Sequence, residues 1–208
     1  MTGFVHTGSL RMPSDGFSTP SRRRLLTMVA GAGLVAVAAP LATATPAQAS
    51  QHLWRWCFQC SGLWFSGNNT NGHCPLGTGL FGWEHPHRSA GSGDYVLTLH
   101  DEPGAGQTDW WWCNRCAGLW TVLLGVFVPK CPNPQYLNGV HVNSGSGMYK
   151  LETLPNMTNG PGGQAQWFTC RKCAGLFFAG NTPQGVCPAG GAHERASGPG
   201  SEHVLRQL

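Results

Sequence analysis

The chain has 208 residues and a formal net charge of +4, but four of its 13 basic residues and one of its 9 acidic residues fall within residues 1–49. The remaining 159 residues carry 9 basic and 8 acidic side chains, which excludes the basic stripe of a nucleic-acid-binding protein. With 30 glycines, 15 prolines and 9 tryptophans, the composition indicates a turn-rich β-protein with aromatic anchors, not a helical one.

Residues 1–49 are predicted to be an export leader. Residues 21–26, Ser-Arg-Arg-Arg-Leu-Leu, resemble the twin-arginine export signal, and the apolar stretch at residues 25–39 is too short to span a bilayer comfortably. Residues 47–49, Ala-Gln-Ala, form a small-x-small cleavage site. The resemblance implies a secreted protein with no stable membrane anchor after cleavage. It also implies that the chain folds, and meets metal, in the reducing cytoplasm before export.

The rest of the chain repeats one pattern three times, at a period of 56 and then 57 residues. Each copy contains the pattern Trp-x-x-Cys-x-x-Cys-x-Gly-Leu. A Cys-Pro pair follows 14 or 15 residues after the second cysteine, and then come a histidine and a short apolar stretch. Chance does not give that register three times, so we predict three tandem modules. They occupy residues 50–101, 102–151 and 152–208.

Each module contains a candidate metal site of three cysteines and one histidine. The CxxC pair brings two sulfurs together on a tight turn, the third cysteine lies on the turn made by the following proline, and the histidine completes a closed tetrahedral set typical of structural zinc. A glycine-rich module of about 55 residues buries too little apolar surface to fold alone, so we expect zinc to supply the missing stability. The predicted ligands of the three zinc ions are Cys57, Cys60, Cys74 and His87; Cys113, Cys116, Cys131 and His141; and Cys170, Cys173, Cys187 and His193.

Other uses of the cysteines are weaker. Disulfides are the main alternative, because the protein is predicted to be secreted, but three cysteines per module and nine in all cannot pair fully. A redox CxxC needs a βαβ context that is absent, and an iron centre with four sulfurs needs a fourth cysteine. His85 is an alternative to His87 as the fourth ligand of the first module.

The residues around each CxxC also recur. The glycine two positions after the second cysteine (Gly62, Gly118, Gly175) is predicted to adopt a positive φ that aims backbone N–H groups at the thiolates. The aromatic residues before and after the CxxC are predicted to form the two arms of a hairpin and a small core over the metal. Those residues are Trp54, Trp110 and Trp167 before it, and Trp64, Trp120 and Phe177 after it.

The whole string, from Trp54 to Leu205, resembles tandem repeats of secreted bacterial proteins, and its CxxC turn resembles the knuckle of zinc ribbons. The expected fold is therefore mainly β, with three small zinc-ribbon-like β-modules in tandem. The modules either pack with pseudo-threefold symmetry or lie as separate beads, and the short linkers favour packed neighbours.

The sequence predicts binding rather than catalysis. No acidic residue recurs in all three copies, no catalytic pattern stands out, and each module can close its own metal shell, so we do not expect an enzyme. Trp83, Trp111 and Trp112 do not recur in every copy, and strand alternation places Trp111 on the opposite face from Trp112. Exposed aromatic rings on a weakly charged secreted module suit a sugar ring or a protein partner.

The predicted function is that of a secreted, metal-stabilised protein that binds an extracellular glycan or the cell wall through Trp83, Trp111 and Trp112. The alternative is a structural or adaptor subunit of a secreted protein assembly. The apolar run at residues 122–128, which occurs only in the second module, is the candidate interface for that alternative.

Export is the first testable consequence. Changing Arg22 and Arg23 to Lys should retain the precursor in the cytoplasm, because the twin-arginine translocon recognises the guanidinium pair, which a lysine ammonium does not reproduce. Immunoblots of cells and culture supernatant measure the retention, and N-terminal sequencing of the exported wild-type protein should begin at Ser50. Undiminished secretion of the double variant would mean that the chain uses the general secretory route.

Overall fold

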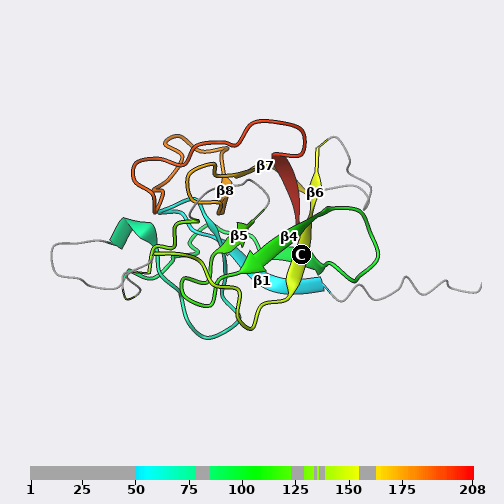
Figure 1. The fold of residues 1–208 in the computed structure, drawn as a ribbon, viewed down its shortest axis with the longest axis horizontal. Coiled ribbons are helices and arrows are strands. Elements are labelled where there is room, and N and C mark those ends of the chain that lie inside the picture. Colours follow the sequence, from blue (N-terminus) through cyan, green and yellow to red (C-terminus); the bar gives the residue numbers. More distant parts are fainter. Residues whose placement is uncertain (1–49, 78–84, 123–128, 134, 136–138, 155–162) are drawn as a thin grey trace, which may run out of the picture. The chain divides into compact units, whose positions relative to one another are not determined.

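The computed structural model describes residues 50–77, 85–122, 129–133, 135, 139–154 and 163–208 (Figure 1). The predicted leader and Trp83 lie outside these described residues, and of the apolar run at residues 122–128 only Val122 is described, with 54% of its surface exposed. In the described part of the chain, no helix has the length and apolar character that crossing a membrane requires.

Each repeat contains three short antiparallel strands. The first two form a hairpin whose turn carries the CxxC pair, and the third strand pairs with the first. The strands are β1 (Ser50–Trp56), β2 (Leu63–Phe65) and β3 (Tyr95–Leu99); β4 (Gln107–Trp112), β5 (Leu119–Thr121) and β6 (Met148–Thr153); and β7 (Gln164–Thr169), β8 (Leu176–Phe178) and β9 (Glu202–Gln207). One 3-10 turn, η1 (Pro75–Gly77), follows Cys74. The predicted β-rich fold and the hairpin arms are confirmed.

A bulge in the first strand of each repeat lies beside the recurring tryptophan. The residue before that tryptophan has a positive φ in every copy: Leu53 (71°), Asp109 (66°) and Gln166 (67°). The register of pairing with the third strand shifts at the same place. A positive φ is unfavourable for a residue with a β-carbon. Its recurrence in all three copies therefore indicates that the bulge is a regular part of the repeat. The freed N–H group of Leu53 donates to Asp94 at 2.7 Å, and that of Gln166 donates to Glu202 at 3.1 Å.

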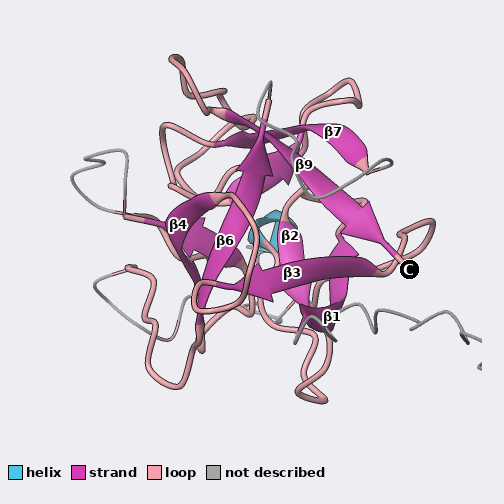
Figure 2. Cartoon of the chain, turned by 90° about the vertical axis from the view of Figure 1, so that its right-hand side faces the viewer, coloured by secondary structure: helices cyan, strands magenta, loops and turns pink. Residues whose placement is uncertain are grey.

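The third strands of the repeats close a ring. β3 pairs with β6, β6 with β9 and β9 with β3, in each case antiparallel, and Figure 2 shows the three strands as the sides of a triangle. A second ring of contacts joins the three hairpins through the bridges Gly62–Phe177, Trp64–Gly118 and Trp120–Gly175. The repeats therefore pack with pseudo-threefold symmetry, as the short linkers predicted, and do not lie as beads.

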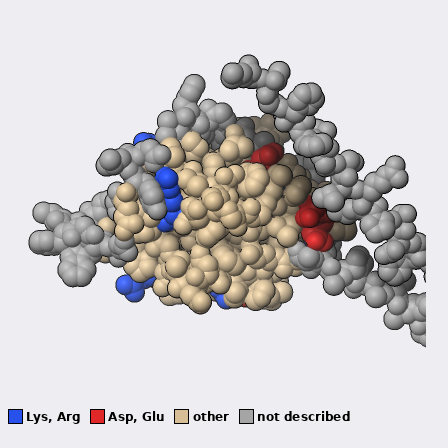
Figure 3. Space-filling view, turned by 60° about the horizontal axis from the view of Figure 1, so that its bottom comes forward, with Lys and Arg blue, Asp and Glu red and all other residues tan. Residues whose placement is uncertain are grey.

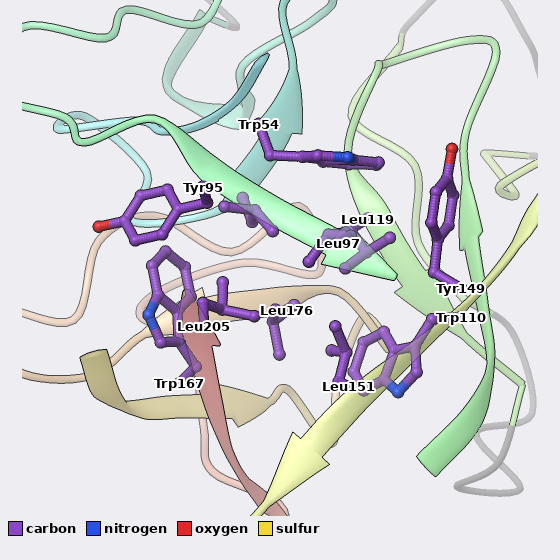
Figure 4. Close-up of a cluster of buried hydrophobic side chains, with 11 residues drawn as sticks. Trp54, Tyr95, Leu97, Trp110, Leu119, Tyr149, Leu151, Trp167, Leu176 and Leu205 are labelled. Carbon is purple, nitrogen blue, oxygen red and sulfur yellow. The ribbon is translucent and has the colours of Figure 1, made fainter. Parts of the chain in front are cut away.

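All three repeats contribute to one hydrophobic core, shown in Figure 4, in which no residue is more than 4% exposed. Its members occupy recurring positions: Trp54, Trp110 and Trp167; Leu63, Leu119 and Leu176; Tyr95 and Tyr149; and Leu97, Leu151 and Leu205. The sequence predicted a separate small core over each metal, and the structure instead places the first tryptophan of every repeat in a common one. A shared core compensates for the small size of each repeat, because the fraction of a chain's surface that is buried on folding rises with the length of the chain.

Edge-to-face contacts between aromatic rings link the repeats in a cycle. Trp54 meets Tyr149 with ring centroids 5.2 Å apart, and Trp167 meets Tyr95 at 5.1 Å. Trp110 completes the cycle by meeting His203 at 5.0 Å. Contacts of this geometry contribute about 0.5–1.5 kcal/mol each beyond the burial of area. Since each tryptophan packs on a ring of another repeat, unfolding one repeat removes packing from the other two.

His203 breaks the symmetry of this core. It is fully buried at the position that tyrosine holds in the other two repeats. The hydroxyl of Tyr95 donates to Gln164 at 2.5 Å, and that of Tyr149 donates to Gln51, whereas the His203 ring lies 3.3 Å from the hydroxyl of Thr169. Burial raises the pKa of both tyrosines to about 12 and lowers the pKa of His203 to about 4. The neutral imidazole is therefore the form that the core accepts.

His203 should make the folded state sensitive to mild acid. Between its unfolded pKa, near 6.5, and its folded pKa, about 4, the unfolded chain binds a proton that the folded chain does not, so stability is lost as the pH falls through this window. We expect a loss of about 2 kcal/mol between pH 7 and pH 5 from this group alone. The His203→Tyr variant restores the residue of the other repeats and should lack this component.

Denaturant unfolding of both proteins at pH 7 and pH 5 measures the difference. Acid also protonates the cysteine sites, but it does so equally in both proteins, so the comparison isolates His203. Identical pH dependence of the two proteins would contradict a buried neutral imidazole.

Candidate functional site

Each hairpin turn presents its two cysteines from a tight, recurring backbone conformation. The N–H group of the residue after the second cysteine donates to the carbonyl of the first, as Ser61 does to Cys57 at 2.8 Å. That residue carries the positive φ in every copy: Ser61 (61°), Ala117 (61°) and Ala174 (62°). The positive φ predicted from the sequence was one residue later, at Gly62, Gly118 and Gly175, and this prediction is wrong.

The recurring glycines lie instead between a sulfur and another repeat. A β-carbon added to Gly62 would lie 3.5 Å from the Cys60 sulfur and 3.9 Å from the Leu176 carbonyl oxygen, and the other two glycines have equivalent neighbours. These are close but ordinary contacts, and nothing in the structure requires glycine there.

The third cysteine of each repeat reaches the site from a separate turn. The N–H group of Cys74 donates to the His85 carbonyl at 2.7 Å, which fixes the start of that turn, and the N–H group of Gly77 donates back to Cys74 at 3.2 Å. Cys131 and Cys187 donate in the same way to later glycines of their own repeats, at 2.7 and 2.8 Å. The proline after each cysteine suits this turn, because it fixes φ and needs no hydrogen-bond acceptor.

The structure brings together the four residues that the sequence proposed as ligands in each repeat. Their ligand atoms all lie within 4.8 Å of one another, and all twelve side chains are buried or nearly so. The first and third sulfurs are 3.9, 3.9 and 3.8 Å apart in the three sites, and the second sulfur lies 3.5, 3.5 and 3.7 Å from the histidine Nδ1. Tetrahedral metal–sulfur bonds of about 2.3 Å place two sulfurs about 3.8 Å apart, so the sites fit a four-coordinate metal ion.

The same distances argue against disulfides. A disulfide bond is about 2.05 Å long, roughly half of the separation found here, and all nine cysteines are unbridged. Three clusters of three cysteines and one histidine can therefore hold three metal ions.

In each site the histidine, the fourth candidate ligand, stacks on an aromatic ring of its own repeat. His87 lies on Trp64 with ring centroids 5.4 Å apart and an interplanar angle of 17°, and the other two histidines stack in the same way on Trp120 and Phe177. The aromatic residue four positions after the second cysteine thus orients the histidine. His85, the alternative considered for the first repeat, lies outside the cluster, as does His203.

The ionisation of the clustered thiols favours a bound cation. Hydrogen bonds from Cys60 and then Cys74 lower the pKa of Cys57, and the first cysteine of each other repeat behaves alike. Hydrogen bonding to Cys57 raises the pKa of Cys74 to about 12 and also raises the pKa of Cys60. One thiolate is therefore tolerated in the buried site, but three require a positive ion at their centre.

Among the described residues, a glycine with a positive φ ties each of two metal sites to another repeat. Gly72 has a φ of +56°, and a β-carbon there would lie 2.1 Å from the Cys116 carbonyl oxygen, so only glycine allows this approach. The same carbonyl accepts a hydrogen bond from His87 Nε2 at 3.2 Å, which leaves Nδ1 to face the sulfurs. Gly185, with a φ of +65°, approaches the Cys60 carbonyl in the same way. Folding around one metal ion thus supports the hairpin turn of a second site.

The two described tryptophans that the sequence proposed for ligand binding lie near the metal sites. Trp111 packs against the second cluster, and Trp112 packs against the first cluster and the shared core, so the predicted alternation of faces is confirmed. Both rings are half-buried rather than exposed. Trp83 lies outside the described residues.

Trp112 also lines a cleft of about 360 Å³ between the first and second repeats. The other lining residues are Gln51, Phe65, Asn68, Leu99, Gly145, Gly147 and Tyr149, and none of them is charged. This cleft was not predicted from the sequence, because its residues come from two repeats. The pair Gly67-Asn68, which recurs as Gly180-Asn181, was the available signal.

Comparison with known proteins adds no relative: no family model, curated protein or solved structure matches this chain. The class of the protein is therefore defined by its own features, three Cys3His clusters that can hold metal ions in one nearly closed β-sheet.

The contacts between the sites predict that the loss of one site weakens metal binding at the other two. Cys57→Ser should lower the metal content from three ions per chain to fewer than two, because loss of the first site loosens its contacts with the other two. The apparent folding energy from one such site, roughly 10–16 kcal/mol for zinc peptides, is comparable to the total stability of a domain. Elemental analysis and tryptophan fluorescence measure the two effects.

Phe58→Ser is the matched control, since Phe58 lies in the same turn, is 45% exposed and offers no sulfur. It should keep three metal ions. A Cys57→Ser protein that retained two ions and native fluorescence would show that the repeats are independent.

Proposed function

We propose that this protein is an exported, zinc-stabilised binding protein that recognises an uncharged extracellular glycan without transforming it. Three sulfurs and one imidazole form the donor set that structural zinc prefers, and the sulfur separations match zinc–thiolate bonds. Three zinc ions, one per repeat, are the expected cofactor.

We propose no catalysis because four protein ligands complete the coordination shell of each candidate metal site. A catalytic zinc keeps one coordination position for water or substrate, whereas each of these sites has four protein ligands and is buried. The metal then acts on folding alone.

The observation that carries the glycan proposal is the cleft between the first two repeats. Its volume, about 360 Å³, falls within the range of small-molecule sites, roughly 300–1,000 Å³. Phe65 and Trp112 offer aromatic surface to the C–H faces of a sugar ring. Since no charged side chain lines the cleft, it suits a neutral polar ligand better than a phosphate or an acidic peptide. Figure 3 shows a face of the molecule on which described charged side chains are few.

Amide groups supply the polar side of this site. Gln51 accepts a hydrogen bond from Tyr149 through Oε1, and Asn68 accepts two from Thr70 through Oδ1, at 3.3 and 3.0 Å. Both carbonyl oxygens are therefore occupied, and the NH₂ groups have no partner within the described residues. Two fixed NH₂ groups beside aromatic rings are suited to donate to sugar hydroxyls.

The predicted export signal supports an extracellular ligand. The leader resembles the twin-arginine signal, a route that exports folded proteins, and metal binding before export would keep the nine thiols from oxidation outside the cell. A structural or adaptor role is the alternative proposal, and the exposed Val122 favours it as the described start of the apolar run.

The test is binding of neutral glycans by the purified protein, measured with chitotriose, cellotriose and maltotriose in solution and with insoluble cell-wall polysaccharide. Asn68→Ala should weaken binding of the preferred trisaccharide about tenfold, the cost of one or two lost hydrogen bonds. Trp112→Leu should weaken it further while three metal ions remain bound.

Thr70→Ala is the control, because it removes the hydroxyl that donates to Asn68 Oδ1 but keeps the Asn68 amide and the hydrogen bond from the backbone N–H of residue 70. It should bind like the wild type. A wild-type protein that retains none of these glycans but captures secreted proteins through Val122 would replace this proposal with the adaptor role.

A further inference from the structure

The residues of the cleft have counterparts at another interface between repeats. At the interface between the third and first repeats, Trp56 takes the place of Trp112, Phe178 that of Phe65, and Asn181 that of Asn68. The pairing registers establish this correspondence, since Trp54 faces Phe65 on β2 as Trp167 faces Phe178 on β8.

The two interfaces also share their supporting contacts. The N–H group of Trp112 donates to Ser146 Oγ at 2.8 Å, and that of Trp56 donates to Ser92 Oγ at the same distance. Tyr149 donates to Gln51 across the first interface, as Tyr95 does to Gln164 across the other. At both interfaces, the hydroxyl of the buried tyrosine donates a hydrogen bond to the side-chain oxygen of the glutamine.

Glycine serves the same purpose in both places. A β-carbon on Gly147 would lie 2.8 Å from the Leu99 side chain, and one on Gly93 would lie 2.6 Å from the Gln207 side chain. The residue at the end of the third strand therefore packs over a glycine of the other repeat. The exchange of leucine for glutamine adds one amide to the second surface.

The remaining interface, between the second and third repeats, has lost these features. Thr121 stands in the place of the phenylalanine, Thr169 in the place of the tryptophan and His203 in the place of the tyrosine. The hydroxyl of Thr169 faces His203 at 3.3 Å, so these replacements form a polar pair of their own. Two of the three interfaces keep the aromatic and amide set, and one does not.

We propose that the surface formed by Trp56, Phe178 and Asn181 is a second binding site for the same class of uncharged glycan, so that one chain holds two segments of a glycan polymer. This inference rests on the proposed function of the first cleft. Trp56 and Phe178 are half-buried and meet edge-to-face at 6.4 Å, while Asn181 is exposed and Gln207 lies beside Gly93. Trp56, Phe178, Asn181 and Gln207 are uncharged, and their aromatic rings and amides define the ligand.

Two sites in one closed fold have a measurable consequence. When one site is bound to a polymer, the second meets a neighbouring segment at an effective concentration near the millimolar range, which raises retention on the polymer without changing affinity for a short sugar. A trisaccharide therefore reports the number of sites, and a polysaccharide reports their cooperation.

The experiment titrates the holoprotein with chitotriose and with cellotriose, and measures retention on the matching insoluble polymers, chitin and cellulose. We expect two trisaccharides per wild-type chain, one each for Asn68→Ala and Asn181→Ala, and none for the double variant at the same concentrations. Each single variant should lose at least tenfold in retention on the polymer. Three bound metal ions in every variant establish that the fold is intact.

One trisaccharide per wild-type chain, together with unchanged binding by Asn181→Ala, would overturn the second site and leave the first cleft standing. No trisaccharide bound by the wild type would overturn both proposals. Equal polymer retention by the wild type and Asn181→Ala would also overturn the second site, since cooperation requires both.

Discussion

Three thiol groups whose sulfur atoms lie within 4.8 Å of one another in a buried position cannot all ionise unless a cation lies between them, and this constraint organises the protein. In each repeat the first thiol has a lowered pKa and the other two have raised ones, so the cluster lacks a positive charge that a metal ion would supply. The hairpin turn, the Cys-Pro turn and the stacked histidine all converge on that point. Because the aromatic residue that orients the histidine belongs to the hairpin, binding the ion also fixes the arm that leads into the core.

The second level of organisation is the closed ring. A single repeat has three short strands and buries too little surface to be stable, but three repeats placed around one axis share eleven core residues. Because β3, β6 and β9 pair with one another, each of them is hydrogen-bonded to another repeat. This pairing reduces the unpaired strand edges through which small β-proteins aggregate. The edge-to-face cycle through Trp54, Trp110 and Trp167 then distributes the stability of each repeat over its neighbours.

Local patterns in the sequence predicted local structure well. The CxxC and Cys-Pro spacings placed the knuckles, and internal comparison selected His87 and His141, which the structure stacks on aromatic residues of the same repeat. The sequence failed at one detail of the hairpin turn and at the contacts between repeats. It assigned a positive φ to Gly62 because glycine tolerates it, whereas Ser61 adopts that conformation under the hydrogen bonding of the turn. It could not place Asn68 and Trp112 in one cleft, since they lie in different repeats and no periodicity records which copies are neighbours.

The pairing of β3 with β9 has a consequence for synthesis of the chain. Tyr95 pairs with Gln207, so the first repeat presents an open strand edge until the third strand of the last repeat leaves the ribosome. The ring cannot close in steps from the N-terminal side, because β3 and β9 belong to the first and last repeats. Metal captured by the early knuckles would hold the nascent repeats in partly ordered form during this delay. During that interval the edge of β3 that later pairs with β9 stays open.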